Sequence, residues 1–191
     1  MRILIGKLGS IGDIVHTLPA LAAVRRALSY AEISWVVEER SAEILKGNPM
    51  IDNLIEVDTH KLRRRRDIDK IIVEAGRQFR GLRRFEFDVA LDFQGLLKSA
   101  TIAKLSGAKR RWGFSRSGLR EPASRLLLTN AVKTPRQIHI IRKNLALATG
   151  ALNIAVPDSQ FEFPISTSVE HIDEAEAIIE KSGVNFALLN P

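Results

Sequence analysis

The fold of this chain is decided close to its N-terminus, by the stretch Arg2-Ile3-Leu4-Ile5-Gly6-Lys7-Leu8-Gly9-Ser10-Ile11-Gly12-Asp13. Its branched apolar run is typical of a buried strand, and the three glycines that follow are typical of a tight loop. From Asp13 to about Ser29, apolar residues recur at helical spacing, and Pro19 is expected to kink or divide the helix. The stretch therefore predicts a strand, a loop and a helix in succession.

The corner between this strand and this helix favours an anion. The first N–H groups of a helix lack partners, and the helix dipole directs its positive end at the loop. Two functional interpretations remain open: the loop binds a phosphate of a ligand, or Asp13 is itself the anion, held ionised and ready to accept a proton. A structural interpretation stands beside them, since Asp is also a preferred helix cap.

The loop differs from the common nucleotide-binding motifs. No Gly-Lys-Ser/Thr follows the glycines at the Walker A spacing, and the fixed Gly-x-Gly-x-x-Gly order of a dinucleotide site is absent. Lys7 and Ser10 either satisfy backbone groups of the loop or face a ligand. For a lysine that ends a buried strand at a glycine-rich turn, we expect the ligand.

Strand patterns alternate with helical patterns along the rest of the chain. Further strands are predicted at 33–37, 54–57, 87–93, 110–114, 161–163 and 185–189. Further helices are predicted at 38–46, 67–84, after Gln94-Gly95 up to about 105, at 137–149 closed by Gly150, and at 168–181, with a partly helical loop at 115–135. This alternation predicts an α/β fold, a Rossmann-like parallel sheet flanked by helices.

The predicted topology places a ligand site beyond the carboxyl ends of the strands, near the point where the strand order reverses. The loops 6–13 and 92–99 are therefore the expected walls of the site. Gln94, Lys98 and Ser99 follow a predicted strand, where residues of a cleft belong. The structural alternative for them is a turn and a helix cap.

Positive charge is concentrated in two segments. Ten Lys and Arg residues lie between Lys61 and Arg84 against three acidic residues, a local excess that equals the +7 of the whole chain. A second basic stretch runs from Lys109 to Arg125 and contains a single acidic residue, Glu121. Such segments imply an anionic partner: nucleic acid, anionic lipid, or a phosphorylated or carboxylated substrate.

Composition narrows the class of protein. With no cysteine, the chain has neither a disulfide framework nor thiolate chemistry, which suits a reducing cytoplasm. It contains no apolar run of membrane-spanning length and no signal-peptide pattern. The four histidines show no metal-ligand spacing with carboxylates. We therefore expect a cytoplasmic globular protein without a metal or cofactor.

Three motifs resemble the bacterial lipopolysaccharide heptosyltransferases of glycosyltransferase family 9. They are Lys7-x-x-Ser10-x-Gly12-Asp13-x-x-His16-Thr17-x-Pro19-Ala20-Leu21, Asp92-x-Gln94-Gly95-x-x-Lys98-Ser99-Ala100 and Arg120-Glu121-Pro122. The first motif is long and specific, and the similarity runs over essentially all 191 residues.

This resemblance implies a GT-B architecture, in which two Rossmann-like domains face a cleft. Residues 1–165 would form the N-terminal, acceptor-binding domain, and 166–191 an interdomain helix and the first strand of a truncated donor-binding domain. The implied reaction is transfer of L-glycero-D-manno-heptose from ADP-heptose to the Kdo region of the lipid A inner core. It proceeds with inversion and without a required metal, at the inner face of the inner membrane, where basic residues also meet anionic headgroups. The donor would bind through the missing C-terminal domain.

The resemblance also assigns roles to residues. Asp13 matches the family's proposed catalytic base. Arginine forks suit the carboxylates and phosphates of such an acceptor. The implied substrate-binding residues are Lys7, Ser10, Gly12, Arg63, Arg64, Arg66, Gln94, Lys98 and Arg120. The structural alternatives are a solvated loop for the arginine run and, for Arg120, a salt bridge to Glu121 or a neighbour.

Two other classes of protein remain as rivals. A basic nucleic-acid-binding α/β module would explain the charge but not the Gly-Asp loop, and aromatic residues that stack on bases make up only 6% of the chain. We therefore expect no nucleic-acid partner. The second rival is a phosphate- or nucleotide-binding Rossmann enzyme that uses loop 6–13 as an anion site.

Overall fold

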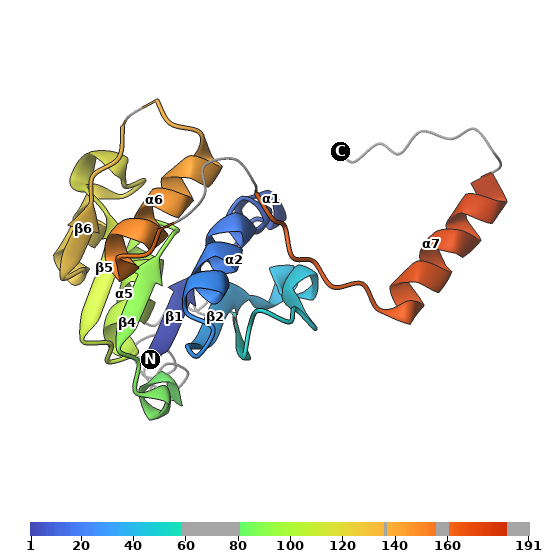
Figure 1. Ribbon diagram of the computed structural model, residues 1–191, viewed down its shortest axis with the longest axis horizontal. Coiled ribbons are helices and arrows are strands. Elements are labelled where there is room, and N and C mark those ends of the chain that lie inside the picture. Colours follow the sequence, from blue (N-terminus) through green and yellow to red (C-terminus); the bar gives the residue numbers. More distant parts are fainter. Residues whose placement is uncertain (59–80, 136, 156–160, 183–191) are drawn as a thin grey trace, which may run out of the picture.

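Six strands form one parallel sheet in the computed structural model, which describes residues 1–58, 81–135, 137–155 and 161–182 (Figure 1). Their order across the sheet is β3-β2-β1-β4-β5-β6. The strands are β1 Arg2–Gly6, β2 Glu32–Glu38, β3 Asn53–Val57, β4 Val89–Asp92, β5 Arg110–Phe114 and β6 Asn130–Val132. The predicted α/β class and parallel sheet are confirmed.

Helices cover both faces of the sheet (Figure 1). The α-helices of the described residues are α1 Ile11–Val15, α2 Leu18–Ala27, α5 Leu97–Leu105, α6 Ile140–Leu152 and α7 Val169–Ser182. Of these, α2 and α6 pack on one face of the sheet and α5 on the other, while α7 lies apart from it. Successive strand residues point to opposite faces. Ile3 and Ile5 accordingly join the core beneath α2 and α6, while Leu4 joins a second core with Ile102 of α5. Burial on both faces explains why β1 reads as a continuous apolar run.

The N-terminal stretch folds as predicted, with one change at its helix. The helix begins at Ile11, with Ser10 as the cap residue, so Asp13 lies in the first turn instead of opening the helix. The predicted division also occurs: α1 ends at Val15 and α2 begins at Leu18. Pro19 lies in the first turn of α2, where a missing N–H group leaves no helical bond unmade.

Several local predictions were wrong. Residues 38–46 form two short 3-10 turns, Glu39–Ser41 and Glu43–Leu45, instead of one helix, and 161–163 is not a strand. The loop predicted at 115–135 contains 3-10 turns and also β6, which pairs with β5 along Trp112 to Phe114. Three residues are too few for an alternating pattern to be visible, so only the partner strand defines β6.

Helix α6 continues past Gly150, the residue predicted to close it. It ends instead at Leu152, and Asn153 takes the left-handed conformation with φ 52°. A Cβ atom at Gly150 would lie 2.9 Å from Val132 Cγ2, which is closer than real Cβ atoms approach another atom. Gly150 therefore lets α6 lie directly against β6 and is not a helix cap.

Part of the basic region lies outside the described residues. This applies to 67–80 of the helix predicted at 67–84, to Arg63, Arg64 and Arg66, and to the strand predicted at 185–189. Residues Gly81–Phe85 form a 3-10 turn. Helix α7 begins after Ser168, whose Oγ accepts the N–H of His171, and extends away from the sheet (Figure 1). Among the residues that the structure describes, no helix is long and apolar enough to cross a bilayer.

The close approach at Gly150 gives a stability prediction. Gly150→Ala should lower the free energy of unfolding by about 1–3 kcal/mol, because the added methyl overlaps Val132 in a packed interface. Urea denaturation measures the change, and Gly12→Ala is the control, since a Cβ there meets nothing within 4 Å. Gly150→Ala as stable as the wild type would show that α6 is free to move away from β6.

Candidate active site

The candidate site lies at the carboxyl ends of β1 and β4, the two central strands. Gly6 of β1 pairs with Val36 of β2 on one side and with Asp92 of β4 on the other. The chain leaves β1 toward β2 and later returns to its opposite side as β4, so the strand order reverses here. Ligands of open α/β sheets bind at such a reversal. The loops after β1 and β4 meet at this point, as the sequence predicts.

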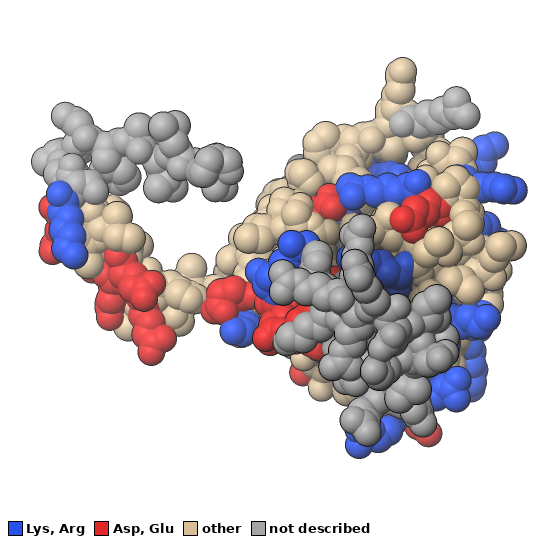
Figure 2. Space-filling model, turned by 180° about the vertical axis from the view of Figure 1, so that it is seen from behind, with Lys and Arg blue, Asp and Glu red and all other residues tan. Residues whose placement is uncertain are grey.

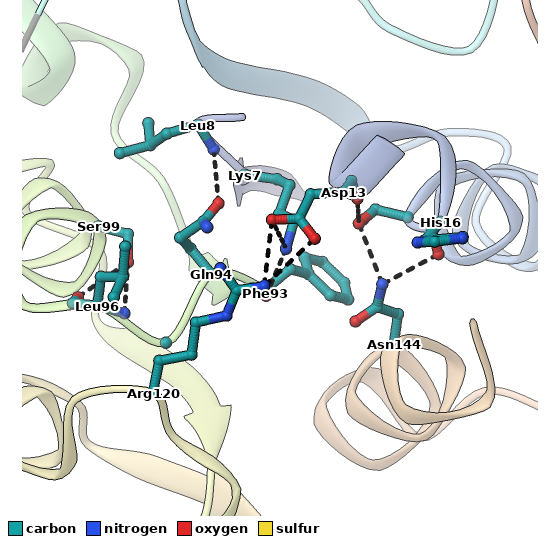
Figure 3. Close-up of polar contacts among 12 residues, drawn as sticks. Lys7, Leu8, Asp13, His16, Phe93, Gln94, Leu96, Ser99, Arg120 and Asn144 are labelled. Carbon is teal, nitrogen blue, oxygen red and sulfur yellow. Dashed lines mark hydrogen bonds and ion pairs between the residues drawn. The ribbon is translucent and has the colours of Figure 1, made fainter. Parts of the chain in front are cut away.

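Asp13 lies between two cations that come from distant parts of the chain (Figure 3). Its Oδ2 atom is 3.7 Å from Lys7 Nζ, and each carboxylate oxygen is 3.4 Å from Arg120 Nη2. The side chains differ in exposure: 2% for Lys7, 17% for Asp13 and 60% for Arg120. The carboxylate is therefore held from beneath by a buried cation and approached from solvent by an exposed one.

Lys7 is a buried cation with little freedom to move. Its Nζ donates to the carbonyl oxygen of Phe93 at 3.3 Å, and its own carbonyl accepts from the indole of Trp35. Burial lowers the pKa of Lys7, while the nearby charge of Asp13 opposes that shift. Paired in this way, Lys7 orients the Asp13 carboxylate from the protein side.

Asp92 is a second carboxyl group at the site, and it is fully buried at the end of β4. Its Oδ1 atom accepts the N–H groups of Gln94 at 3.0 Å and Gly95 at 3.2 Å. Burial raises the pKa of Asp92 to about 6, against the opposing effects of the Ser99 hydroxyl, of these N–H groups and of the Lys7 charge. The sequence analysis placed Asp92 in a motif but gave it no role. The sequence signal that could have singled out Asp92 is an acidic residue at the end of an apolar strand.

Gln94 and Lys98 make contacts within the protein. Gln94 is buried, and its Oε1 accepts the N–H of Leu8 at 3.2 Å. Lys98 Nζ lies 3.2 Å from Oε1 of Glu38, a buried acid at the end of β2. Ser99 adopts the cap role of its structural alternative, because its hydroxyl bonds to both backbone groups of Leu96. Substrate contacts by Gln94 and Lys98 stay predictions.

Ser10 and Gly12 are exposed in the loop and first turn beside Asp13. A Cβ atom at Gly12 would meet nothing within 4 Å, so the space next to this backbone is open. The backbone beside Asp13 therefore leaves room for a ligand. The substrate contacts proposed for Ser10 and Gly12 stay predictions. Those proposed for Arg63, Arg64 and Arg66, which lie outside the described residues, also stay predictions.

Helix α6 contributes residues that the sequence analysis did not place at the site. Asn144 is fully buried and donates to the His16 carbonyl and to Thr17 Oγ1, at 3.0 and 3.1 Å, which fastens α6 to the junction of α1 and α2 (Figure 3). Lys143 donates to the Gly118 carbonyl at 2.7 Å. Burial and then the charge of Arg120 lower the pKa of Lys143. A lysine or asparagine in a helix gives no sequence signal for such a role.

Comparison with known protein families identifies the chain. The sequence model of glycosyltransferase family 9 (heptosyltransferase) matches residues 75–188, more than half of the chain. The chain belongs to glycosyltransferase family 9. The resemblance on which the sequence analysis relied is therefore confirmed.

Individual family members agree with this assignment. Lipopolysaccharide heptosyltransferase 1 of Pseudomonas aeruginosa is 33% identical over 83% of this chain and 45% of the relative, and that of Salmonella typhimurium is 30% identical over 92% and 55%. The structure of Escherichia coli heptosyltransferase WaaC with ADP-2-deoxy-2-fluoro heptose superposes with a TM-score of 0.78 at 29% identity, covering 85% of this chain and 52% of that one. This chain spans about half the length of these relatives, and its sheet matches the N-terminal half of GT-B heptosyltransferases.

Asp92 makes the stability of this family 9 chain depend on pH. Its pKa is about 6 in the fold against an ordinary 3.8, so the folded state holds a proton that the unfolded chain has already released. The free energy of unfolding should therefore fall by about 3 kcal/mol, through this group, as the pH rises from about 4 to about 7. Urea denaturation across that range measures the slope.

The matched variant for this pH test is Asp92→Asn, which cannot titrate. Other groups contribute equally to both proteins, so the difference between the two slopes reports Asp92 alone. The wild-type stability should fall more steeply with pH than that of the variant. Parallel curves would contradict the raised pKa.

Proposed function

We propose that the full-length protein is an inverting heptosyltransferase of lipopolysaccharide biosynthesis, corresponding to heptosyltransferase 1. It transfers L-glycero-D-manno-heptose from ADP-heptose to the Kdo region of the lipid A inner core. Family membership supports the reaction class. The observation that carries the proposal is the Asp13 carboxylate, held between Lys7 and Arg120 at the strand-order reversal. The relative solved with an ADP-heptose analogue supports a nucleotide-sugar donor.

Asp13 is the proposed general base. The acceptor oxygen forms a bond to the anomeric carbon of the heptose, and the bond from that carbon to the diphosphate breaks on the opposite side. The electron pair leaves with ADP, and the hydroxyl proton of the acceptor passes to Asp13. Such a base has to lie within hydrogen-bond reach of the hydroxyl. Asp13 suits this role because the buried Lys7 ammonium orients its carboxylate from the protein side, while 17% of the Asp13 side chain stays exposed to solvent.

The proposed acceptor surface is cationic. Arg120 is 60% exposed, and its planar fork can bind a carboxylate of the acceptor while it remains close to Asp13. Arg63, Arg64 and Arg66 are the further arginines proposed for the acceptor's anionic groups. The run of four adjacent arginines at 63–66 also suits an anionic membrane surface at the cytoplasmic side.

The proposed division of the chain places an acceptor-binding domain at 1–165 and the start of a donor-binding half at 166–191. Helix α7 supports it, because Val169, Ile172, Ile178 and Ile179 are exposed apolar residues on one helix. The helix also carries a cluster of acidic residues (Figure 2). An interdomain helix that packs on a second domain would cover such apolar side chains.

Replacing the base tests the proposed function. Asp13→Asn in the full-length protein should lower kcat by about 100-fold or more, since general-base catalysis contributes on that scale, while acceptor affinity is kept. Transfer from ADP-heptose to Kdo-lipid A is followed by release of ADP, and acceptor affinity by calorimetry. Glu56→Gln, an exposed change on edge strand β3, is the control and should retain wild-type turnover.

Two results would contradict this proposal. Full turnover in Asp13→Asn would show that Asp13 is not the general base. A gain in inorganic phosphate binding by the same variant, without loss of transfer, would favour the rival in which loop 6–13 is an anion site.

A further inference from the structure

We propose that Asp92 is a positioning residue that sets Lys7 and Arg120 on the two sides of Asp13. Asp92 touches neither the carboxylate of Asp13 nor, in the proposed function on which this inference rests, the substrate. It acts through the loop that follows β4. Three successive sets of contacts connect it to the two cations.

The first set fixes the loop itself. Asp92 Oδ1 accepts the N–H groups of the residues two and three positions further along the chain, Gln94 at 3.0 Å and Gly95 at 3.2 Å. This is the local turn that an aspartate side chain forms with its own backbone. Gly95 takes the left-handed conformation, φ 70°, that the turn requires. Because Asp92 is buried at the end of β4, the turn is anchored to the central sheet.

The second set runs from this turn to Lys7. The side chain of Gln94 accepts the N–H of Leu8 at 3.2 Å, and the carbonyl of Phe93 accepts from Lys7 Nζ at 3.3 Å. The N–H of Phe93 also donates to the Gly6 carbonyl at 3.1 Å. Residues 93 and 94 thus hold both the backbone beside Lys7 and its ammonium group. A loop of another shape would leave this buried ammonium without its carbonyl partner.

The third set runs from the turn to Arg120. The Gly95 carbonyl accepts the N–H of Glu121 at 3.1 Å, and the carboxylate of Glu121 accepts the N–H of Leu97 at 2.6 Å. A Cβ atom at Gly95 would lie 3.3 Å from Leu119 Cδ2 and 3.5 Å from the backbone nitrogen of Arg120. The segment that carries Arg120 is therefore packed and bonded against the turn.

Asp88, at the other end of β4, is an aspartate with a structural role only and can be compared with Asp92. It lies just before β4, where its Oδ2 accepts the N–H of Arg2 at 2.9 Å. Both aspartates therefore bond to backbone N–H groups next to the central strands. Only the Asp92 end of the strand is connected to Lys7 and Arg120, so Asp88 is a matched control.

The test uses four variants of the full-length protein: Asp92→Ala, Asp92→Asn, Gly95→Ala and Asp88→Ala. Crystal structures give the two distances from Asp13, 3.7 Å to Lys7 and 3.4 Å to Arg120 in the wild type. Kinetics with ADP-heptose and Kdo-lipid A give kcat and KM, and urea denaturation gives the stability of each variant. The structures need no turnover, so they test the positioning even if the proposed reaction is wrong.

Asp92→Ala should lose both ion pairs of Asp13 and about 100-fold in kcat, the scale expected when a catalytic group is misplaced by about 1 Å. Asp92→Asn keeps an acceptor oxygen for the two N–H groups, so it should restore both ion pairs and most of that kcat. Asp88→Ala should lose stability but keep both ion pairs and kcat.

Gly95→Ala tests the contacts to Arg120 separately from the contacts to Lys7. It keeps the proposal testable even if Asp92→Ala does not fold. The added methyl would lie 3.3 Å from Leu119 Cδ2 and strain the left-handed backbone at residue 95, on the side of the turn that faces residues 119–121. This variant should therefore lose the Arg120 contact, while residues 93 and 94 keep the Lys7 contact. Asp92→Ala with both ion pairs intact, Gly95→Ala with an unmoved Arg120, or Asp88→Ala with an equal loss of kcat would each overturn the proposal.

Discussion

The buried ammonium of Lys7 is the constraint on which the arrangement of this site depends. A charged group removed from water is costly unless it meets opposite charge and hydrogen-bond acceptors. Lys7 finds the Asp13 carboxylate and the Phe93 carbonyl within 3.7 Å and 3.3 Å. The requirement to pair one buried cation therefore ties the first loop, the first helix and the loop after β4 to a single geometry. Asp13 is consequently oriented before any ligand arrives.

The sheet topology explains why these groups meet. Because β1 lies between β2 and β4, the ends of the three strands bring together segments up to 85 residues apart, such as Lys7 and Asp92. The segment with Arg120 then folds back over Gly95. A site with a proposed single base needs this convergence, since the Asp13 carboxylate, one buried cation and one exposed cation have to share a small volume.

Much of this fold was visible in the sequence, and the exceptions have physical causes. The strand, loop and helix of residues 2–13 were predictable because each has a local sequence pattern: an apolar run for the buried strand, glycines for the tight loop and helical spacing for the helix. Strand β6 was not, because three residues carry no period, and Gly150 was misread because its role depends on Val132, a contact distant in sequence. Local patterns predict local structure, and packing between elements decides the rest.

The candidate site was predictable to a similar extent. Lys7, Asp13 and Arg120 were singled out from motifs, and the structure brings them together. The contacts of Gln94 with Leu8, and the part of Lys143 beside Arg120, follow only from the folded arrangement. Asp92 had a visible signal, an acid closing an apolar strand, but its importance lies in a network of backbone bonds. No sequence pattern records which N–H groups a carboxylate will accept.

A crystal structure of the full-length protein with a Kdo-containing acceptor fragment tests the central claim most directly. The account predicts an acceptor hydroxyl within about 2.6–3.2 Å of an Asp13 carboxylate oxygen and an acceptor carboxylate against Arg120. An acceptor bound elsewhere, with Asp13 still enclosed by Lys7 and Arg120 and no sugar hydroxyl near it, would contradict the account.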